Sequence, residues 1–522
     1  MDTNEPNSGP TFRAHCCPCG DHSADGMNRR TFLGGLGGAA ALGGVALTGL
    51  SWAALAAEQA DDLAPPARRP LVVKPVLTFE LPTRKPQASW RNWGGIQTQE
   101  DLDKELARIK GELDKLQAAA DFPVTFLPLA AGRNAGELAA AKDEIASADV
   151  TLLYAAGGAQ NALDMIGETA KNTIIFIRHK SGPVYLWYEI ISPRYLRQHT
   201  DKPVVKNVGD QDVVIDSQDE LLWRMRSLCG LQNTIGSRII AVGGPSGWAT
   251  RAAPQLARDR FKLEIQTVPY PALGELIKEA RADQAAVERA RKRAEAYLAL
   301  PGTTLETDRS FVDNAFLLDQ IFRSLMKSAD CRAMTINGCM GTIMPLAETS
   351  ACLPLSTLND DGYMAFCESD FVIIPAGILL RNISGRPHFM NDPTYPHDGI
   401  ITLAHCTGPR KMDGKTLEPA RILTHFESDY GAAPKVEMRK GQIVTNVIAG
   451  FKADRWVGLT GEIVDAPMLP ICRDQIDIRF KCDSLKLAER MPGFHWMTFY
   501  GDYLKEIGYA LKRVGIEWEC LG

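Results

Sequence analysis

One stretch in the second half of the chain carries most of the side chains that could do chemistry. Glu368 and Asp370 lie just before an apolar run, and Asp392 ends a second apolar stretch. His405 follows in the next apolar run, and the distant His495 is a candidate to join it. Two carboxylates and one or two imidazoles that meet in one cleft would form a divalent-metal site with acid–base capacity.

Glu368 and Asp370 also have a structural explanation. They precede residues 371–380, which we expect to form a helix that Pro375 makes short or irregular. A carboxylate at a helix N-terminus caps the backbone and stays ionised, so it is also able to bind a cation. We favour the cap for Asp370 and the cation ligand for Glu368.

The other three residues have structural alternatives as well. Asp392 directly precedes Pro393, and Asn-Asp-Pro is a favourable turn sequence. His405 and His495 could each be hydrogen-bonded core histidines. If these groups do converge, carboxylates with imidazoles suit Mn²⁺, Mg²⁺ or Zn²⁺ better than a copper or iron–sulfur centre.

The N-terminus has the features of an export signal. Residues 27–33 form a twin-arginine motif, and a Gly-, Ala- and Leu-rich run follows to about residue 55. Small residues at 53–57 offer a cleavage zone, so residues 1–57 are predicted to be a leader with a twin-arginine signal. This predicts that the protein folds and takes up metal in the cytoplasm, meets the twin-arginine translocation machinery, and is exported to the periplasm. A single membrane helix or an uncleaved anchor is the alternative.

The cysteines beyond this leader form no CxxC pair and no zinc-finger spacing. Most of them are therefore expected to be small buried apolar residues, although disulfides are possible in an oxidising compartment. Cys367 and Cys406 flank the candidate ligands. The sequence leaves open whether they only pack there or also tune the site.

Length and patterning predict several domains. The 522 residues exceed one core, and a net charge of −5 gives no reason to expect nucleic acid as a partner. After a linker at 58–86 that contains one strand, short apolar strands alternate with amphipathic helices over 87–203 and 204–385. This predicts an α/β fold of two Rossmann-like domains with parallel sheets. Short alternating runs over 386–522 predict a mostly antiparallel C-terminal β-barrel.

Two local features bear on how the site is built. A Gly-rich turn at residues 243–248 follows the strand expected at 237–242, so it lies at the carboxyl end of that strand. A plain strand-to-helix turn is the favoured interpretation, with sugar contact as the alternative. Residues 275–298 are expected to form one long, charged, solvated helix.

Three blocks resemble the L-fucose isomerase and L-arabinose isomerase superfamily. They are CESDF at 367–371, the run from 385 to 406, and GFHWMTFYGDY at 493–503. The resemblance implies two α/β domains, a barrel domain and a site between the second and third. It also implies a homo-oligomer.

The resemblance also assigns roles to residues. Glu368 would be the first carboxylate ligand and an acid–base group. Asp392 would be the second carboxylate ligand and the second acid–base group, although Asn391 could align in its place. His495 would be the third ligand, and His405 matches an additional histidine of the arabinose branch. Sugar contacts are suggested at Tyr395 and Trp496, with core packing an equal alternative for Trp496.

The implied activity is the interconversion of an aldose and a ketose through an ene-diol intermediate, with Mn²⁺ or another divalent cation as cofactor. Glu368 and Asp392 would be the catalytic pair that transfers protons. Known enzymes of this kind are cytoplasmic, so the export signal is a departure. The alternatives are an exported, non-catalytic carbohydrate-binding protein and another metal-assisted sugar transformation, by an epimerase or lyase, on the same fold.

Overall fold

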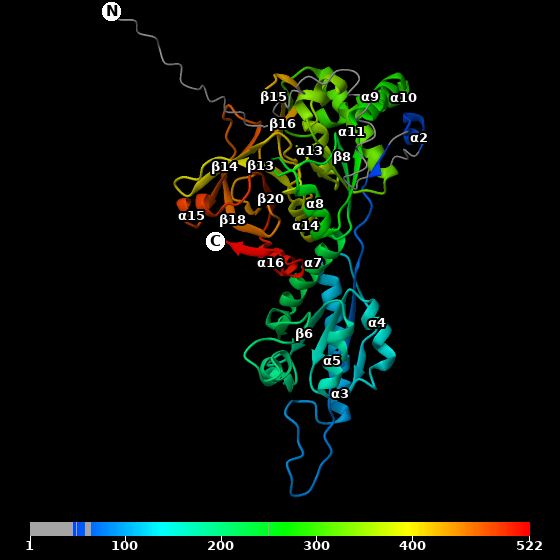
Figure 1. Cartoon of the computed structure of the whole chain (residues 1–522), viewed down its shortest axis with the longest axis vertical. Helices are drawn as coiled ribbons and strands as arrows, with labels where there is room; N and C mark the ends of the chain where they lie inside the picture. Colours follow the sequence, from blue (N-terminus) through cyan, green and yellow to red (C-terminus); the bar gives the residue numbers. More distant parts are fainter. Residues whose placement is uncertain (1–44, 48–49, 58–63, 249, 522) are drawn as a thin grey trace, which may run out of the picture.

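The structure is a computed structural model that describes residues 45–47, 50–57, 64–248 and 250–521. The twin-arginine motif at 27–33 lies outside the described residues. The described chain is a mixed α/β protein with two parallel sheets and a closed antiparallel barrel. In Figure 1 the first α/β unit, in cyan, lies at one end of an elongated molecule, and the second unit and the barrel lie together at the other.

The first unit is built on a parallel sheet in the order β3-β2-β5-β6-β7, with β4 pairing beside β2. Its strands are β2 (Leu71–Thr78), β3 (Val124–Phe126), β4 (Ala130–Gly132), β5 (Val150–Ala155), β6 (Thr173–Ile177) and β7 (Val213–Ile215). Its α-helices are α3 (Gln99–Ala119), α4 (Lys142–Ser147), α5 (Gln160–Thr169) and α6 (Trp187–Ile190). The strand expected inside the linker at 58–86 is β2, which lies in the interior of this sheet between β3 and β5.

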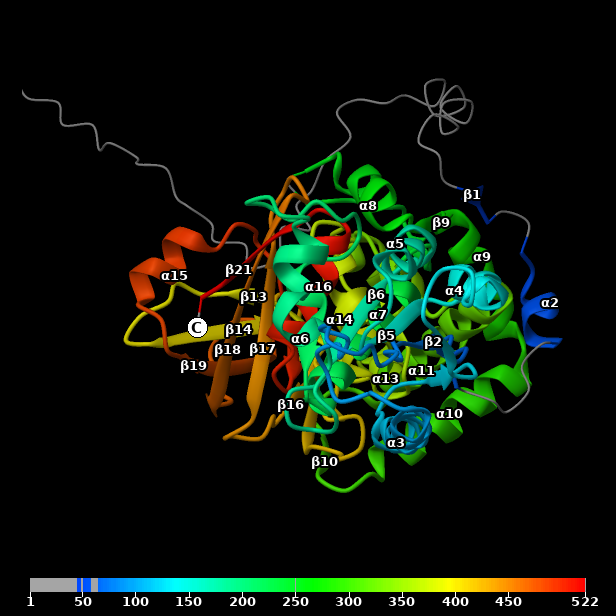
Figure 2. The ribbon, with the colours of Figure 1, turned by 90° about the horizontal axis from the view of Figure 1, so that it is seen from below.

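The second unit has a parallel sheet in the order β1-β9-β8-β11-β12. Its strands are β1 (Val45–Ala46), β8 (Arg238–Val242), β9 (Glu264–Val268), β11 (Ala333–Ile336) and β12 (Met364–Phe366). Its helices are α7 (Gln218–Thr234), α8 (Ala253–Phe261), α9 (Tyr270–Ala282), α10 (Gln284–Leu298), α11 (Arg309–Ser328), η6 (Cys339–Ile343), α12 (Met344–Ala347), α13 (Cys352–Asp360) and α14 (Ile374–Ser384). In Figure 2, α9, α10 and α11 lie on the side of the molecule away from the barrel strands β14, β17 and β18.

The prediction of one helix over 275–298 is wrong. Asp283 separates α9 from α10, and its side chain accepts hydrogen bonds from the backbone N–H groups of Ala285 and Ala286. An aspartate with an extended backbone is a good N-cap, so it starts a new helix at this point. The described end of the predicted leader, α2 (Trp52–Ala57), packs here, and the indole N–H of Trp52 donates to Asp283 at 2.9 Å.

In the described part of the chain, six strands close into an antiparallel barrel in the order β17-β20-β13-β14-β19-β18, with β18 returning to β17. They are β13 (Phe389–Pro393), β14 (Ile400–His405), β17 (Ile443–Ala449), β18 (Arg455–Asp465), β19 (Asp474–Phe480) and β20 (Trp496–Tyr500). The C-terminal strand β21 (Glu517–Cys520) pairs with β18. In the sequence, α15 (Ser484–Arg490) lies between β19 and β20, and α16 (Leu504–Arg513) follows β20. Two strands of the region predicted to form the barrel, β15 (Ala420–His425) and β16 (Tyr430–Val436), instead form a separate small sheet with β10 (Thr303–Leu305).

The second unit and the barrel share one core. Ile336 at the end of β11, Leu403 in β14 and Trp496 in β20 belong to the same buried hydrophobic cluster. The carboxyl edge of the second sheet therefore meets the barrel through packed side chains, and polar groups that lie there are buried. Of the helices in the described residues, none combines the length and apolar character needed to cross a membrane.

Candidate metal centre

Glu368 lies in a tight turn between β12 and α14. Glu368 and Ser369 have positive φ angles of 58° and 51°, a backbone conformation that non-glycine residues adopt at a cost of about 1 kcal/mol or more. The predicted helix over 371–380 begins only at Ile374, so Glu368 does not open it. Pro375 lies in the first turn of α14, a position that favours proline. The helix therefore begins at Ile374 and not at the predicted residue 371.

The Gly-rich turn after β8 holds this strained segment in place. Ser246 donates its backbone N–H to the carbonyl of Ser369 at 3.2 Å, and Phe371 donates to the carbonyl of Ser246 at 3.1 Å. The Ser369 hydroxyl donates to the carbonyl of Gly244 at 2.9 Å. The carboxyl ends of parallel strands meet at one edge of a sheet, which is where ligands bind in open α/β folds. The turn at 243–248 is thus part of the framework of the site.

The barrel supplies the other groups. Asp392 on β13 pairs with Ala404 on β14, and His405 is the last residue of β14. His495 directly precedes β20, the strand next to β13. Residues from the three neighbouring strand segments therefore reach the same point opposite Glu368.

Interatomic distances show that these side chains converge. Nε2 of His495 lies 3.2 Å from Oε2 of Glu368 and 3.2 Å from Oδ1 of Asp392. Nε2 of His405 lies 3.7 Å from Oε1 of Glu368. Glu368, His405 and His495 each offer a ligand atom within 4.8 Å of the others, and all three are buried.

The central atoms have unmet hydrogen-bonding capacity. Among the described residues, four buried polar atoms here have no hydrogen-bond partner: Oε1 of Glu368, Oδ1 of Asp392, Nε2 of His405 and Nε2 of His495. A buried polar atom without a hydrogen bond costs about 1–3 kcal/mol, and a bound cation would satisfy all four atoms together. Two carboxylate oxygens and two imidazole nitrogens are a suitable donor set for a divalent cation.

Asp370 orients one of these ligands. Its Oδ2 lies 2.7 Å from Nδ1 of His495, while its Oδ1 accepts a hydrogen bond from the backbone N–H of Val372 at 3.0 Å. The capping prediction for Asp370 thus describes one of its two carboxylate oxygens. The other fixes the ring of His495 so that Nε2 faces Glu368 and Asp392, as carboxylates commonly do for metal-binding histidines.

Burial and the short distances between the four side chains shift their pKa values. Burial raises the pKa of the Asp392 carboxyl to about 6, although His495 and His405 oppose that shift. Burial acts in the same direction on Glu368, but the two imidazoles outweigh it and hold the pKa of that carboxyl well below its usual range. Burial alone would lower the pKa of each imidazole, yet the carboxylates raise the pKa of His405 and His495 to about 10. Without a cation, protonated imidazoles balance the carboxylate charge, and a bound cation would replace those protons.

Asn391 and Asp392 point to opposite sides of β13, as neighbours in a strand do. The amide of Asn391 donates to the hydroxyl of Thr498 at 2.9 Å. That hydroxyl donates in turn to Asn446 at 2.7 Å. Asp392, rather than Asn391, is the residue that faces Glu368 and His495.

The predicted sugar-contacting aromatics differ in their surroundings. Tyr395 is 67% exposed, whereas Trp496 is fully buried in the shared core. An aromatic side chain that the sequence analysis did not single out lies beside the centre. Trp248, at the end of the Gly-rich turn, is 38% exposed, stacks on Phe494 at 4.2 Å, and presents its ring to His495 at 6.5 Å. Its position at the carboxyl end of a parallel strand was the available signal.

Comparison with known proteins adds no assignment. No model of a known protein family matches the chain, and no curated protein matches it.

Proposed function

We propose that the protein is a metal-dependent aldose–ketose isomerase that acts on a monosaccharide through an ene-diol intermediate. The observation that carries the proposal is the convergence of four polar atoms without hydrogen bonds at the buried junction of the second sheet and the barrel. The sequence resemblance to the L-fucose and L-arabinose isomerase superfamily supports the same activity. The two sheet orders, β3-β2-β5-β6-β7 and β9-β8-β11-β12, support Rossmann-like, doubly wound domains as part of that proposal.

Glu368, Asp392 and His495 would hold the cation, with His405 as a fourth ligand. We propose Mn²⁺, because a donor set of carboxylates and imidazoles suits this ion and the superfamily resemblance implies it. Bound there, the cation would polarise the sugar carbonyl and stabilise negative charge on the sugar oxygens as the carbon loses its proton.

The two carboxylates divide the proton transfers between them. Glu368 would be the base that takes the proton from the carbon beside the carbonyl. Asp392 would give a proton to the carbonyl oxygen, and the ene-diol would result. Glu368 then returns its proton to the neighbouring carbon, and Asp392 takes back a proton from the other hydroxyl.

Trp248 and Phe494 would line one side of the sugar site. Their stacked rings lie next to His495, and Trp248 is partly exposed. A flat apolar surface beside a polar centre suits the C–H face of a sugar ring. Tyr395 remains a proposed contact, whereas full burial of Trp496 favours its packing role.

Deuterium exchange tests the proposal. In D₂O, the Mn²⁺-loaded protein should incorporate deuterium beside the carbonyl of a cognate sugar from a panel of aldoses and ketoses. Glu368→Gln removes the base and should lower that exchange by roughly 100-fold or more. Asp398→Asn is the matched control, because Asp398 is exposed, has a φ of 51° and asparagine tolerates that conformation.

Two results would contradict the assignment. Full exchange activity in Glu368→Gln would remove the proposed base. Tight Mn²⁺ binding with no exchange on any sugar would favour the non-catalytic carbohydrate-binding alternative.

We further propose export through the twin-arginine pathway and assembly as a homo-oligomer. The motif at residues 27–33 supports export, and the resemblance supports assembly. Metal uptake before export would follow, because the pathway carries folded proteins. A reporter fused after residue 57 should reach the periplasm and should stay in the cytoplasm when Arg29 and Arg30 are replaced by lysine. Light scattering of the purified protein should give a mass above one chain.

A further inference from the structure

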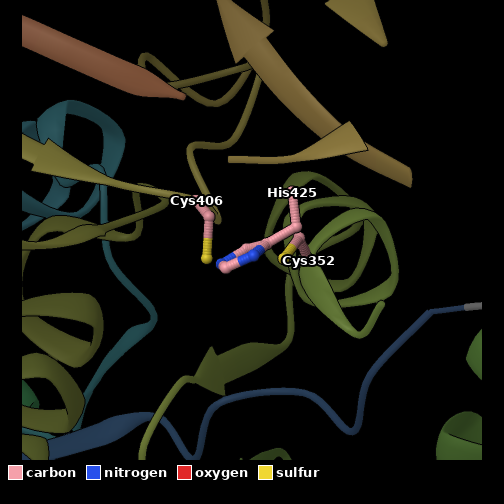
Figure 3. A group of neighbouring side chains, drawn as sticks. All are labelled: Cys352, Cys406 and His425. Atoms are coloured by element: carbon pink, nitrogen blue, oxygen red, sulfur yellow. The ribbon is translucent and has the colours of Figure 1, made fainter. Parts of the chain in front are cut away.

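A second group of ligand-type side chains lies beside the metal centre and takes no part in it. Cys352, Cys406 and His425 each offer a ligand atom within 4.8 Å of the other two, and all three are buried. Figure 3 shows the three side chains pointing toward one another from different elements. Cys352 begins α13, Cys406 directly follows β14, and His425 ends β15.

The local structure brings each group to this point. The pairing of β15 with β16 shifts register between Leu423 and His425, and such a bulge redirects a side chain. Ser428 Oγ lies 3.3 Å from Nδ1 of His425, which orients the ring and leaves Nε2 for another partner. The dipole of α13 favours negative charge at its first residue, Cys352. Ala433 is the third member of this buried cluster with the two cysteines.

Cys406 and its neighbour His405 link this group to the first centre. His405 presents Nε2 to Glu368, while its Nδ1 lies 3.7 Å from Sγ of Cys406. Cys367, His405 and Cys406 also lie within ligand distance of one another. Sγ of Cys367, however, already contacts Sγ of Cys339 at 3.7 Å, and Nε2 of His405 faces the carboxylates. The set with Cys352 and His425 therefore draws on groups that the first centre does not use.

We propose that Cys352, Cys406 and His425 form a second metal site, which takes a thiophilic d¹⁰ cation, Zn²⁺ or Cu⁺. Thiolate ligands select such cations, whereas Mn²⁺ and Mg²⁺ prefer oxygen donors. The two neighbouring centres would thus hold different metals. A cation here would also join α13, the barrel strand β14 and the small sheet of β15.

Cobalt spectroscopy on the full chain tests this site. The protein is purified under reducing conditions, stripped with a chelator and titrated with Co²⁺ alone. The expected result is one equivalent of Co²⁺ that shows a near-ultraviolet thiolate-to-metal charge-transfer band. Glu368→Gln should keep this band, so failure of the isomerase proposal is distinguishable from failure of this one. Displacement of the band by added Zn²⁺ or by added Cu⁺ identifies the cation that the site prefers.

Cysteine variants locate the ligands. Cys352→Ser should lose the charge-transfer band, and Cys229→Ser, which alters a buried cysteine of α7 in the first core, should keep it. Absence of the band in the reduced wild-type protein would overturn the proposal. So would its survival in Cys352→Ser, or its loss in Cys367→Ser but not in Cys352→Ser.

A measurement on the wild-type protein covers the case in which a variant does not fold. Under mildly denaturing conditions, Zn²⁺ or Cu⁺ should protect Cys352 and Cys406 from alkylation, as peptide mass mapping would show. Equal alkylation of both residues with and without these cations would overturn the proposal. Isolation of a Cys352–Cys406 disulfide from cells would also overturn it.

Discussion

Asp370 combines a local and a long-range role in one side chain. One carboxylate oxygen accepts from Val372, and the other holds His495 by Nδ1 at 2.7 Å. Asp370→Asn would keep the first contact, but it would place an amide N–H where His495 needs an acceptor. We expect the affinity for Mn²⁺ to fall by roughly 10- to 100-fold with little change in fold, because outer partners of metal ligands have effects of that size.

Calorimetric titration with Mn²⁺ measures this effect. The circular dichroism spectrum of Asp370→Asn should match that of the wild type, and Asp398→Asn should bind Mn²⁺ normally. An unchanged affinity in Asp370→Asn would mean that the contact with His495 serves packing alone.

The affinity for metal should depend on pH. The pKa values of His405 and His495 are raised to about 10 when no cation is present, so both rings are protonated at neutral pH. A cation needs neutral imidazoles, so binding must release protons, and affinity should rise with pH through the neutral range. Mn²⁺ dissociation constants measured between about pH 6 and pH 9 should fall steadily, with proton release detectable in weakly buffered solution. A dissociation constant that does not change with pH would contradict the proposed imidazole ligands.

Sequence patterns pointed to the candidate ligands more readily than to the groups around them. Glu368, Asp392 and His495 are ionisable residues in apolar surroundings, and the family resemblance put them in order. The second contact of Asp370 was not predictable, because it joins residues 125 positions apart. Trp248 was missed for a similar reason, since a tertiary contact with Phe494 places it beside the site.

At the scale of elements, the packing of α14 against β12 decides where Glu368 stands. Gly377 lies in α14, and a Cβ atom added there would come within 2.3 Å of the ring of Phe366 in β12. The helix and the strand approach so closely because this glycine has no side chain. Phe366 precedes Glu368 by two residues, so a shift of its ring would move this candidate ligand as well.

Gly377→Ala should therefore destabilise the protein, although alanine favours helices by about 1 kcal/mol over glycine. Overpacking of a buried contact should cost about 1–3 kcal/mol and lower the affinity for Mn²⁺. The matched control is Gly111→Ala in the exposed part of α3, where an added Cβ meets nothing within 4 Å. Urea unfolding should show a gain in stability for the control and a loss for Gly377→Ala. A gain in both would mean that Phe366 relaxes without strain.

Strands that are buried at every residue were predicted correctly from the sequence. Residues 150–155 and 173–177 are continuous apolar runs, and both are buried strands of a parallel sheet. The prediction of one helix over residues 275–298 was wrong because the helical pattern continues through Asp283. Only the N-cap formed by the Asp283 side chain separates α9 from α10. Strand β15 was predicted, but alternation within a strand does not reveal which sheet it joins, and β15 pairs with β16 and β10 outside the barrel.

At the scale of the whole molecule, the candidate centre joins two parts that share a core. Glu368 comes from the second α/β unit, whereas Asp392, His405 and His495 come from the barrel sequence. The first α/β unit has a core of its own and contributes no side chain to the four-residue centre. A cation at this junction would stabilise the second unit and the barrel together, because it can bind only while both are folded and in contact.

Hydrogen exchange should show that a bound cation protects the second unit and the barrel more than the first unit. With Mn²⁺ at about 100 times its dissociation constant, linkage predicts about 2.7 kcal/mol of added protection for amides that exchange through opening of this junction. We expect that protection in β12, β13, β14 and β20, and little change in β2, β5 and β6. Glu368→Gln should lose it. Equal protection in the first unit would show that the three parts open as one, whereas protection confined to the barrel would contradict ligation by Glu368.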